Sequence, residues 1–329
     1  MRELINDILK WRGDGKRIAL AMVIKAWGSA PRPVGSHMII SDRGEMVGSV
    51  SGGCVETAVV EEAQKVIAAQ KPKRLKYGVT NEEAWSVGLA CGGQIEILVQ
   101  PCSPDDSFYQ RLFEAIRQNQ TAIAVTNIGD AAAKKNLLIK DDEKTVLNLD
   151  AENPPREAFL LENDDGVFFV EPYLPPLRLI VIGGVHIAIP LTKFAAELEY
   201  EVYLIDPRTA FANPDRFPHV RHILNQWPQD ALPELKIDQN TFVVLLTHDP
   251  KIDDPALKSA LAASPAYVGV LGSKRTHEKR VKRLRDAGIT ESQIAQLHAP
   301  VGLKIGAKST AEIALSILAQ MTAVRRGAA

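Results

Sequence analysis

The spacing of hydrophobic residues divides the chain into two parts that predict different architectures. In the first part, a helical pattern near the N-terminus leads to strand-like runs at residues 18–26, 37–40 and 45–50. A helical pattern follows over residues 56–69, and residues 95–99 close the region with another strand-like run. Helices interleaved with short strands in this way predict a mixed α+β domain.

A weaker copy of this pattern follows. Residues 108–117 have helical spacing, and residues 121–126 form a strand-like run. The run at 167–172 matches the run at 95–101 in type and position. We therefore expect residues 103–174 to be a degenerate internal repeat, with an unrelated segment of similar pattern as the alternative. In a repeat, the cysteine–glycine loops found only in the first copy would carry the function.

Beyond a linker at residues 173–176, strands and helices alternate. The strand-like runs are continuously apolar, as expected for parallel strands that are buried on both faces. These runs are residues 179–182, 202–205, 242–246 and 268–271. The alternation predicts an α/β chain in which an N-terminal domain, residues 1–174, precedes a Rossmann-like parallel-sheet domain, residues 177–329. Ser309 and Glu312 have the spacing of a capping box and predict the start of the last helix.

Charge and composition argue against several classes of function. The chain has 329 residues, with 39 Lys and Arg against 40 Asp and Glu, and the net charge of −1 gives no field that would attract nucleic acid. The longest apolar stretch, residues 179–191, is too short to span a bilayer and is interrupted by Gly183, Gly184 and Pro190, so we expect no membrane span. Three cysteines do not make a disulfide framework, which favours a cytoplasmic protein.

Two short segments, residues 52–56 and 91–96, each combine a cysteine with two glycines and a nearby glutamate. Glycine pairs let the backbone approach a ligand closely, and a thiolate placed there is a soft nucleophile or metal ligand. The candidate residues are Gly52, Gly53, Cys54, Glu56, Cys91, Gly92 and Gly93. We expect Cys54 and Cys91 to lie close together, whereas Cys102 has no such context. The structural alternative is that these cysteines are buried where strands pack closely.

The glycine loop of the second domain departs from the dinucleotide-binding fingerprint. Gly183, Gly184 and His186 are candidate cofactor contacts. However, Val185 occupies the place of the second fingerprint glycine, where a β-branched side chain would crowd a pyrophosphate. Binding of NAD(P) in the usual pose is therefore not expected. Asp206 ends the next strand, where it would meet a ribose hydroxyl or serve as an ordinary turn residue.

A basic helical stretch over residues 274–285 has two interpretations. Such a run usually forms a solvated helix face. In addition, a helix that begins at a strand end can receive a phosphate at its N-terminus, so Ser273 and Arg275 are candidate phosphate contacts. His248 follows another strand end and is predicted to belong to the same rim.

Together these motifs resemble the XdhC/CoxI family, the accessory proteins of xanthine dehydrogenase and related molybdenum hydroxylases. The matching rows extend over nearly the whole chain and are residues 28–35, 48–56, 91–93, 206–208, 247–249, 269–275 and 300–303. Where the family has Gly-Ala-Gly-His-Val-Gly, this chain has Gly-Gly-Val-His-Ile-Ala at residues 183–188. That departure leaves the ligand of the second domain open.

The resemblance implies a chaperone for molybdenum cofactor (molybdopterin with its metal) rather than a catalyst. Such a protein binds and protects the cofactor, supports its sulfuration and inserts it into an apo-hydroxylase of the xanthine dehydrogenase type. The resemblance also implies a cysteine desulfurase as a second partner, and a homodimer. Cys54 and Cys91 would then be thiolates near the molybdenum, the glycine loops would supply backbone donors, and Arg32 would contact the cofactor's phosphate or the client enzyme.

Two alternatives from other classes remain at this point. An NAD(P)-dependent oxidoreductase would use the Rossmann-like domain, and Val185 argues against it. A thiol-redox or sulfur-relay protein would use Cys54 and Cys91, but the chain has no Cys-x-x-Cys motif.

Overall fold

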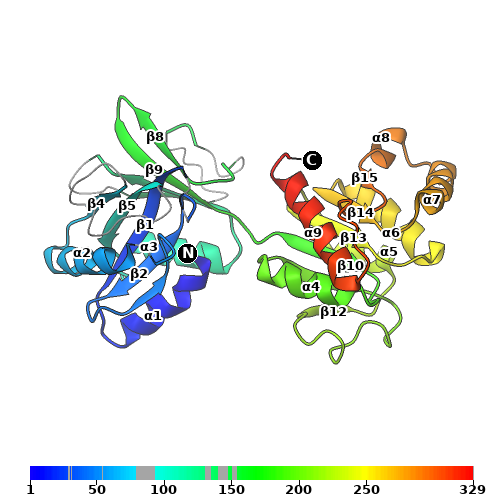
Figure 1. Cartoon of the computed structure of the whole chain (residues 1–329), viewed down its shortest axis with the longest axis horizontal. Helices are drawn as coiled ribbons and strands as arrows, with labels where there is room; N and C mark the ends of the chain where they lie inside the picture. Colours follow the sequence, from blue (N-terminus) through cyan, green and yellow to red (C-terminus); the bar gives the residue numbers. More distant parts are fainter. Residues whose placement is uncertain are drawn as a thin grey trace. The chain divides into compact units, whose positions relative to one another are not determined.

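A computed structural model gives the fold of the chain as two compact units, Met1–Pro175 and Pro176–Ala329 (Figure 1). The residues that the structure describes are 1–28, 30, 32–53, 55–78, 93–129, 135–139, 147–149 and 154–328.

The first unit begins with an antiparallel sheet of strand order β3-β2-β1-β5-β4 among the described residues. Its strands are β1 (Ile18–Trp27), β2 (His37–Ser41), β3 (Met46–Gly48), β4 (Lys73–Tyr77) and β5 (Gln94–Pro101). Alternate residues of β1 face two different cores: Ala19, Ala21 and Val23 pack with helix α2 (Glu56–Ala69; Figure 1). Leu20 and Met22 pack on the opposite face with helix α1 (Ile5–Gly13). A 3₁₀ turn, η1 (Arg2–Leu4), precedes α1.

A second antiparallel sheet has the strand order β7-β6-β9-β8. Its strands are β6 (Ala122–Asn127), β7 (Lys135–Ile139), β8 (Phe159–Asn163) and β9 (Gly166–Tyr173), preceded by helix α3 (Ser107–Arg117). Tyr109 and Phe113 of α3 fill the same core as Leu20 of β1, so the two sheets of this unit share one hydrophobic interior. The antiparallel pairs β1–β5 and β6–β9 occupy corresponding places in their sheets. The internal repeat itself stays a prediction.

The second unit is built on a parallel sheet of order β12-β11-β10-β13-β14-β15 among the described residues. Its strands are β10 (Arg178–Ile182), β11 (Glu201–Ile205), β12 (His222–Leu224), β13 (Thr241–Leu245), β14 (Tyr267–Val270) and β15 (Leu297–His298). In chain order this is the 3-2-1-4-5-6 arrangement of a Rossmann fold, with the switch in direction between β10 and β13. The predicted fold class is confirmed.

Helices cover both faces of this sheet, which explains the continuously apolar strands. Leu179 and Val181 of β10 pack with α4 (Ala188–Glu197) and α9 (Thr310–Arg325). Ile180 and Ile182 pack on the other face, which is covered by α5 (Pro228–Ala231), α6 (Pro250–Ala263), α7 (Lys274–Asp286) and α8 (Glu291–Ile294). A 3₁₀ turn, η3 (Leu232–Leu235), follows α5.

The last helix starts as its sequence predicts. Ser309 is the N-cap of α9, and both hydrogen bonds of the capping box with Glu312 are present. Within the part of the chain that the structure describes, no helix has the length and hydrophobicity needed to cross a bilayer.

Candidate functional site

The carboxylate of Glu56 organises the glycine loop in front of α2. Its Oε1 accepts hydrogen bonds from the Ser49 hydroxyl at 2.8 Å and from the Ser51 backbone N–H at 2.9 Å. Its Oε2 accepts from the Gly53 N–H at 2.9 Å and from the Ser51 hydroxyl. Only 6 % of Glu56 is exposed. Burial opposes ionisation, but the hydrogen bonds from Ser51 and Ser49 outweigh it and lower the pKa of Glu56 to about 2.

This anchoring leaves Gly52 and Gly53 at the surface. Both are exposed and have positive φ, +75° and +112°, a region that favours glycine. Their N–H groups are already used, by the Ser49 hydroxyl at 2.9 Å and by Glu56. The exposed turn therefore offers the carbonyl oxygens of Gly52 and Gly53, with open space beside Gly53, and not the backbone donors expected from the sequence.

Several residues of the first unit that the sequence predicted as site residues are not part of the hydrogen-bond network around Glu56. Cys54, Cys91 and Gly92 lie outside the described residues, so the expected proximity of the two cysteines stays a prediction. Gly93 is buried directly before β5, and Arg32 is exposed on the segment between β1 and β2. Cys102, which had no functional context in the sequence, is buried in the shared core.

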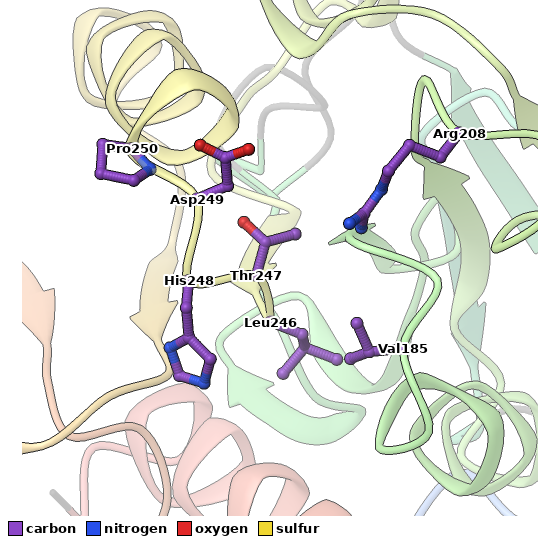
Figure 2. Close-up of a pocket in the computed structure, with 7 residues that line it drawn as sticks. All are labelled: Val185, Arg208, Leu246, Thr247, His248, Asp249 and Pro250. Carbon is purple, nitrogen blue, oxygen red and sulfur yellow. The ribbon is translucent and has the colours of Figure 1, made fainter.

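A cleft of about 520 Å³ opens in the second unit where β10 and β13 end. This is the switch point at which Rossmann folds bind ligands. Its lining is shown in Figure 2 and consists of Val185, Arg208, Leu246, Thr247, His248, Asp249 and Pro250. Arg208 and Asp249 come from opposite sides of the cleft, and the ring of His248 extends from the segment between β13 and α6 (Figure 2). Val185 and His248 thus meet in one site.

Asp206 closes the glycine loop beside this cleft. Its Oδ2 accepts from the backbone N–H of Gly184 at 2.9 Å and from Arg208 Nη2 at 2.8 Å, and its Oδ1 accepts from Arg208 Nε at 2.9 Å. Burial opposes ionisation of this fully buried side chain, but the bonds from Arg208 and Gly184 outweigh it and lower the pKa of Asp206. Since both carboxylate oxygens are engaged, Asp206 would have to give up these bonds to hold a ribose.

The glycines after β10 are required by packing. A Cβ atom at Gly184 would overlap the carbonyl oxygen of Phe211, and Gly183 has φ +103°. The ring of Phe211 also supports the Arg208 guanidinium, which lies 4.0 Å from the ring centroid. The glycine loop at Gly183 and Gly184, Asp206 and Arg208 therefore form one fixed wall of the cleft.

Other predicted residues of the second unit lie apart from this cleft. His186 is exposed and does not line it. Ser273 caps α7 by accepting a hydrogen bond from the Thr276 N–H at 3.2 Å, and Arg275 is exposed on the first turn of that helix.

A buried polar chain behind the cleft was not predicted from the sequence. Thr247 donates through its hydroxyl to Asp253 Oδ1, and Arg280 Nη2 lies 3.4 Å from Asp253 Oδ2. The same nitrogen donates to the Leu271 carbonyl at 3.1 Å. Arg280 is only 1 % exposed, so the solvated-face interpretation of the basic stretch is wrong for this residue. The sequence signal that could have shown this is Leu284, an apolar residue four positions after Arg280. It lies on the same face of α7 and is also buried.

Two family models match the segments that contain these features. The model described as the XdhC and CoxI family matches residues 11–78, which include the Glu56 loop. The model described as the XdhC Rossmann domain matches residues 179–321, which include the cleft. The chain belongs to the XdhC and CoxI family. The resemblance seen in the sequence is confirmed.

Two named relatives match almost end to end. The chain is 28 % identical over 312 residues to the molybdenum cofactor insertion chaperone PaoD of Escherichia coli, covering 95 % of this chain and 85 % of that protein. It is 24 % identical over 327 residues to a probable subunit of xanthine dehydrogenase from Bacillus subtilis, covering 95 % and 94 %. A solved structure described as a xanthine dehydrogenase from Bacillus halodurans has a TM-score of 0.79 and 28 % identity, covering 98 % of this chain and 96 % of that one.

Proposed function

We propose that this protein binds molybdenum cofactor as cargo, protects it, and inserts it into an apo-hydroxylase of the xanthine dehydrogenase type. One observation carries the proposal: buried Glu56 holds an exposed Gly52–Gly53 turn immediately before Cys54. The E. coli relative that is named a molybdenum cofactor insertion chaperone covers the same part of the chain.

The chemistry of this loop suits a soft metal centre. Thiolates are soft ligands and match a molybdenum–dithiolene group, so Cys54 and Cys91 are the proposed molybdenum-proximal residues. A turn without side chains at Gly52 and Gly53 leaves room for a bulky cofactor beside position 54. Because Glu56 already uses the loop's N–H groups, the turn is organised before cargo arrives.

The cleft of the second unit is proposed separately, as a site for a phosphate group. Arg208 is held rigidly by Asp206, and its Nη1 has no hydrogen bond to any other described residue. A fixed guanidinium edge suits a phosphate oxygen. His248 and Thr247 lie on the other side of the same cleft. Ser273, Arg275 and Arg32 are further proposed phosphate or partner contacts.

We further propose a cysteine desulfurase as the source of sulfur for the bound cofactor, a homodimer as the working form, and action in the cytoplasm. The first two points rest on the family resemblance alone. A monomer in light scattering at micromolar concentration would contradict the dimer.

The function can be tested by purifying the protein from a host that makes molybdenum cofactor. Bound molybdenum and pterin are measured, followed by activation of an apo-hydroxylase. Cys54→Ser and Cys91→Ser should lose most of the bound molybdenum and fail to activate the client, because a hydroxyl stays protonated near neutral pH. Cys102→Ser is the matched control and should retain both. If Cys54→Ser and Cys91→Ser both keep molybdenum and still activate the client, the thiolate mechanism is wrong.

A further inference from the structure

The first unit contains a second cleft, of about 430 Å³, at the end of α2 remote from the glycine loop. Gln70 after α2, Gln100 at the end of β5, Phe108 at the start of α3 and Lys135 at the start of β7 all line it. Helix α2 has 14 residues, which places the cleft about 20 Å along the helix from Glu56. It is therefore a separate site.

The side chain of Gln100 contains a buried hydrogen-bond acceptor for which the described residues supply no donor. The residue is 3 % exposed, and its Oε1 has no hydrogen-bond partner among the described residues. Its amide nitrogen lies 4.0 Å from the Met22 sulfur, which is a weak acceptor. Most buried polar groups in proteins are paired. Since Gln100 is one of the residues that line the cleft, a ligand bound there is a source of the missing N–H donor.

Lys135 is half-buried, and its ammonium group has no acidic partner in the part of the chain that the structure describes. Its Nζ donates to the Tyr109 hydroxyl at 3.0 Å and lies 4.4 Å from the centroid of that ring. Among the described residues it forms no ion pair. Burial lowers its pKa. An ammonium has three protons to donate, so the group can bind an anion at the cleft.

The N-terminus of α3 completes the lining. Asp106, the N-cap, accepts a hydrogen bond from the Phe108 N–H at 2.9 Å through one carboxylate oxygen, and the residue is exposed at the cleft. The first turn of a helix favours an anion, whereas Asp106 favours a cation. Together with Lys135, the cleft thus presents one positive and one negative position with no net charge.

We propose that this cleft binds a zwitterionic α-amino acid. The carboxylate of the ligand faces Lys135 and the first turn of α3, and its ammonium faces Asp106 and supplies the donor that Gln100 lacks. The half-buried ring of Phe108 lies beside the ligand's side chain. This site does not depend on cofactor carriage, since it shares no residue with the glycine loop.

Calorimetric titration of the full chain with the proteinogenic amino acids tests the proposal directly. At least one should bind with a dissociation constant below about 1 mM. The corresponding amine without a carboxylate, and the acid without an ammonium, should each bind at least about tenfold more weakly, because each loses a charge-assisted contact. For alanine these controls are ethylamine and propionate.

Two variants link binding to the cleft. Gln100→Leu and Lys135→Met should each weaken the best ligand about tenfold or more, while Gln100→Leu keeps or raises the melting temperature because it removes an unpaired polar atom. Lys10→Met, on the exposed face of α1, is the control and should bind normally. The proposal is overturned if no amino acid binds, if the amine or the acid alone binds as well, or if Gln100→Leu and Lys135→Met both bind as the unchanged protein does.

Discussion

The backbone N–H of Gly184 donates a 2.9 Å hydrogen bond to the carboxylate of Asp206, so the acid at the end of β11 fixes the glycine loop after β10. In a dinucleotide-binding protein these two positions meet the ribose and the pyrophosphate. In this protein the Gly184 N–H and the Asp206 carboxylate form a hydrogen bond with each other. Arg208 donates two further hydrogen bonds to the same carboxylate. The wall of the cleft is therefore complete without a ligand.

Asp206→Asn should destabilise the protein by about 2–3 kcal/mol, because it removes the charge from a buried hydrogen-bond network and leaves Arg208 without its ionic partner. Urea unfolding measures the free energy. Asp215→Asn changes an exposed acid in the same unit and should stay within about 0.5 kcal/mol. Equal stability of the two variants would show that the Asp206 network contributes little.

Glu56→Gln should destabilise the first unit and remove part of the pH dependence of its free energy of unfolding. The pKa of Glu56 falls from 4.5 to about 2 on folding, which corresponds to roughly 3 kcal/mol of stabilisation. Since the folded pKa is depressed, this contribution is complete above about pH 4.5 and is lost as the pH falls through about 2. Acid unfolding of Glu56→Gln should therefore be less steep in this window. Glu61→Gln, exposed on α2, should behave like the unchanged protein.

Arg280→Met should cost about 3–5 kcal/mol, because it leaves buried Asp253 without a counter-charge. Burial already raises the pKa of Asp253. An acid whose pKa is raised on folding contributes stability at low pH, and this contribution declines as the pH rises through the folded pKa. The loss of unfolding free energy caused by Arg280→Met should therefore grow with pH. The double variant Asp253→Asn/Arg280→Met should lose less than the sum of the single changes. Strict additivity in denaturant unfolding would argue against coupling.

Cys102 should be unreactive in the folded protein. Burial raises the pKa of its thiol to about 12, so almost no thiolate exists at pH 8. In Cys54→Ser/Cys91→Ser, Cys102 is the one cysteine left of three. A disulfide reagent should then modify no thiol natively and one thiol per chain in guanidinium. Rapid modification of the native protein would mean that the core opens at this position.

Patterns local to the sequence predicted much of the fold. Apolar runs such as residues 179–182 indicated buried parallel strands, and Ser309 with Glu312 marked the start of α9. These signals are reliable because backbone hydrogen bonding and side-chain periodicity act over a few residues.

Partners distant in sequence were harder to predict. Arg280 belongs to a run of basic residues, and only tertiary packing against Asp253 shows that it is buried. Likewise, composition gives no sign that Asp206 binds Gly184 rather than a ligand. Glu56 was predicted as a cofactor contact, whereas the described geometry shows it holding the loop; a direct contact with cargo stays a prediction.

The hydrophobic interior shared by the two sheets of the first unit limits how evolution can shorten this protein. Residues 103–174 carry no cysteine–glycine loop, yet Tyr109 and Phe113 fill the space beside Leu20 of β1. A gene that lost this stretch would expose the face of β1 opposite α2 to water. Natural selection for a folded first unit would therefore retain residues 103–174 even if they never contacted a ligand or a partner protein. This stretch need not have arisen at the same time as the cysteine–glycine loops.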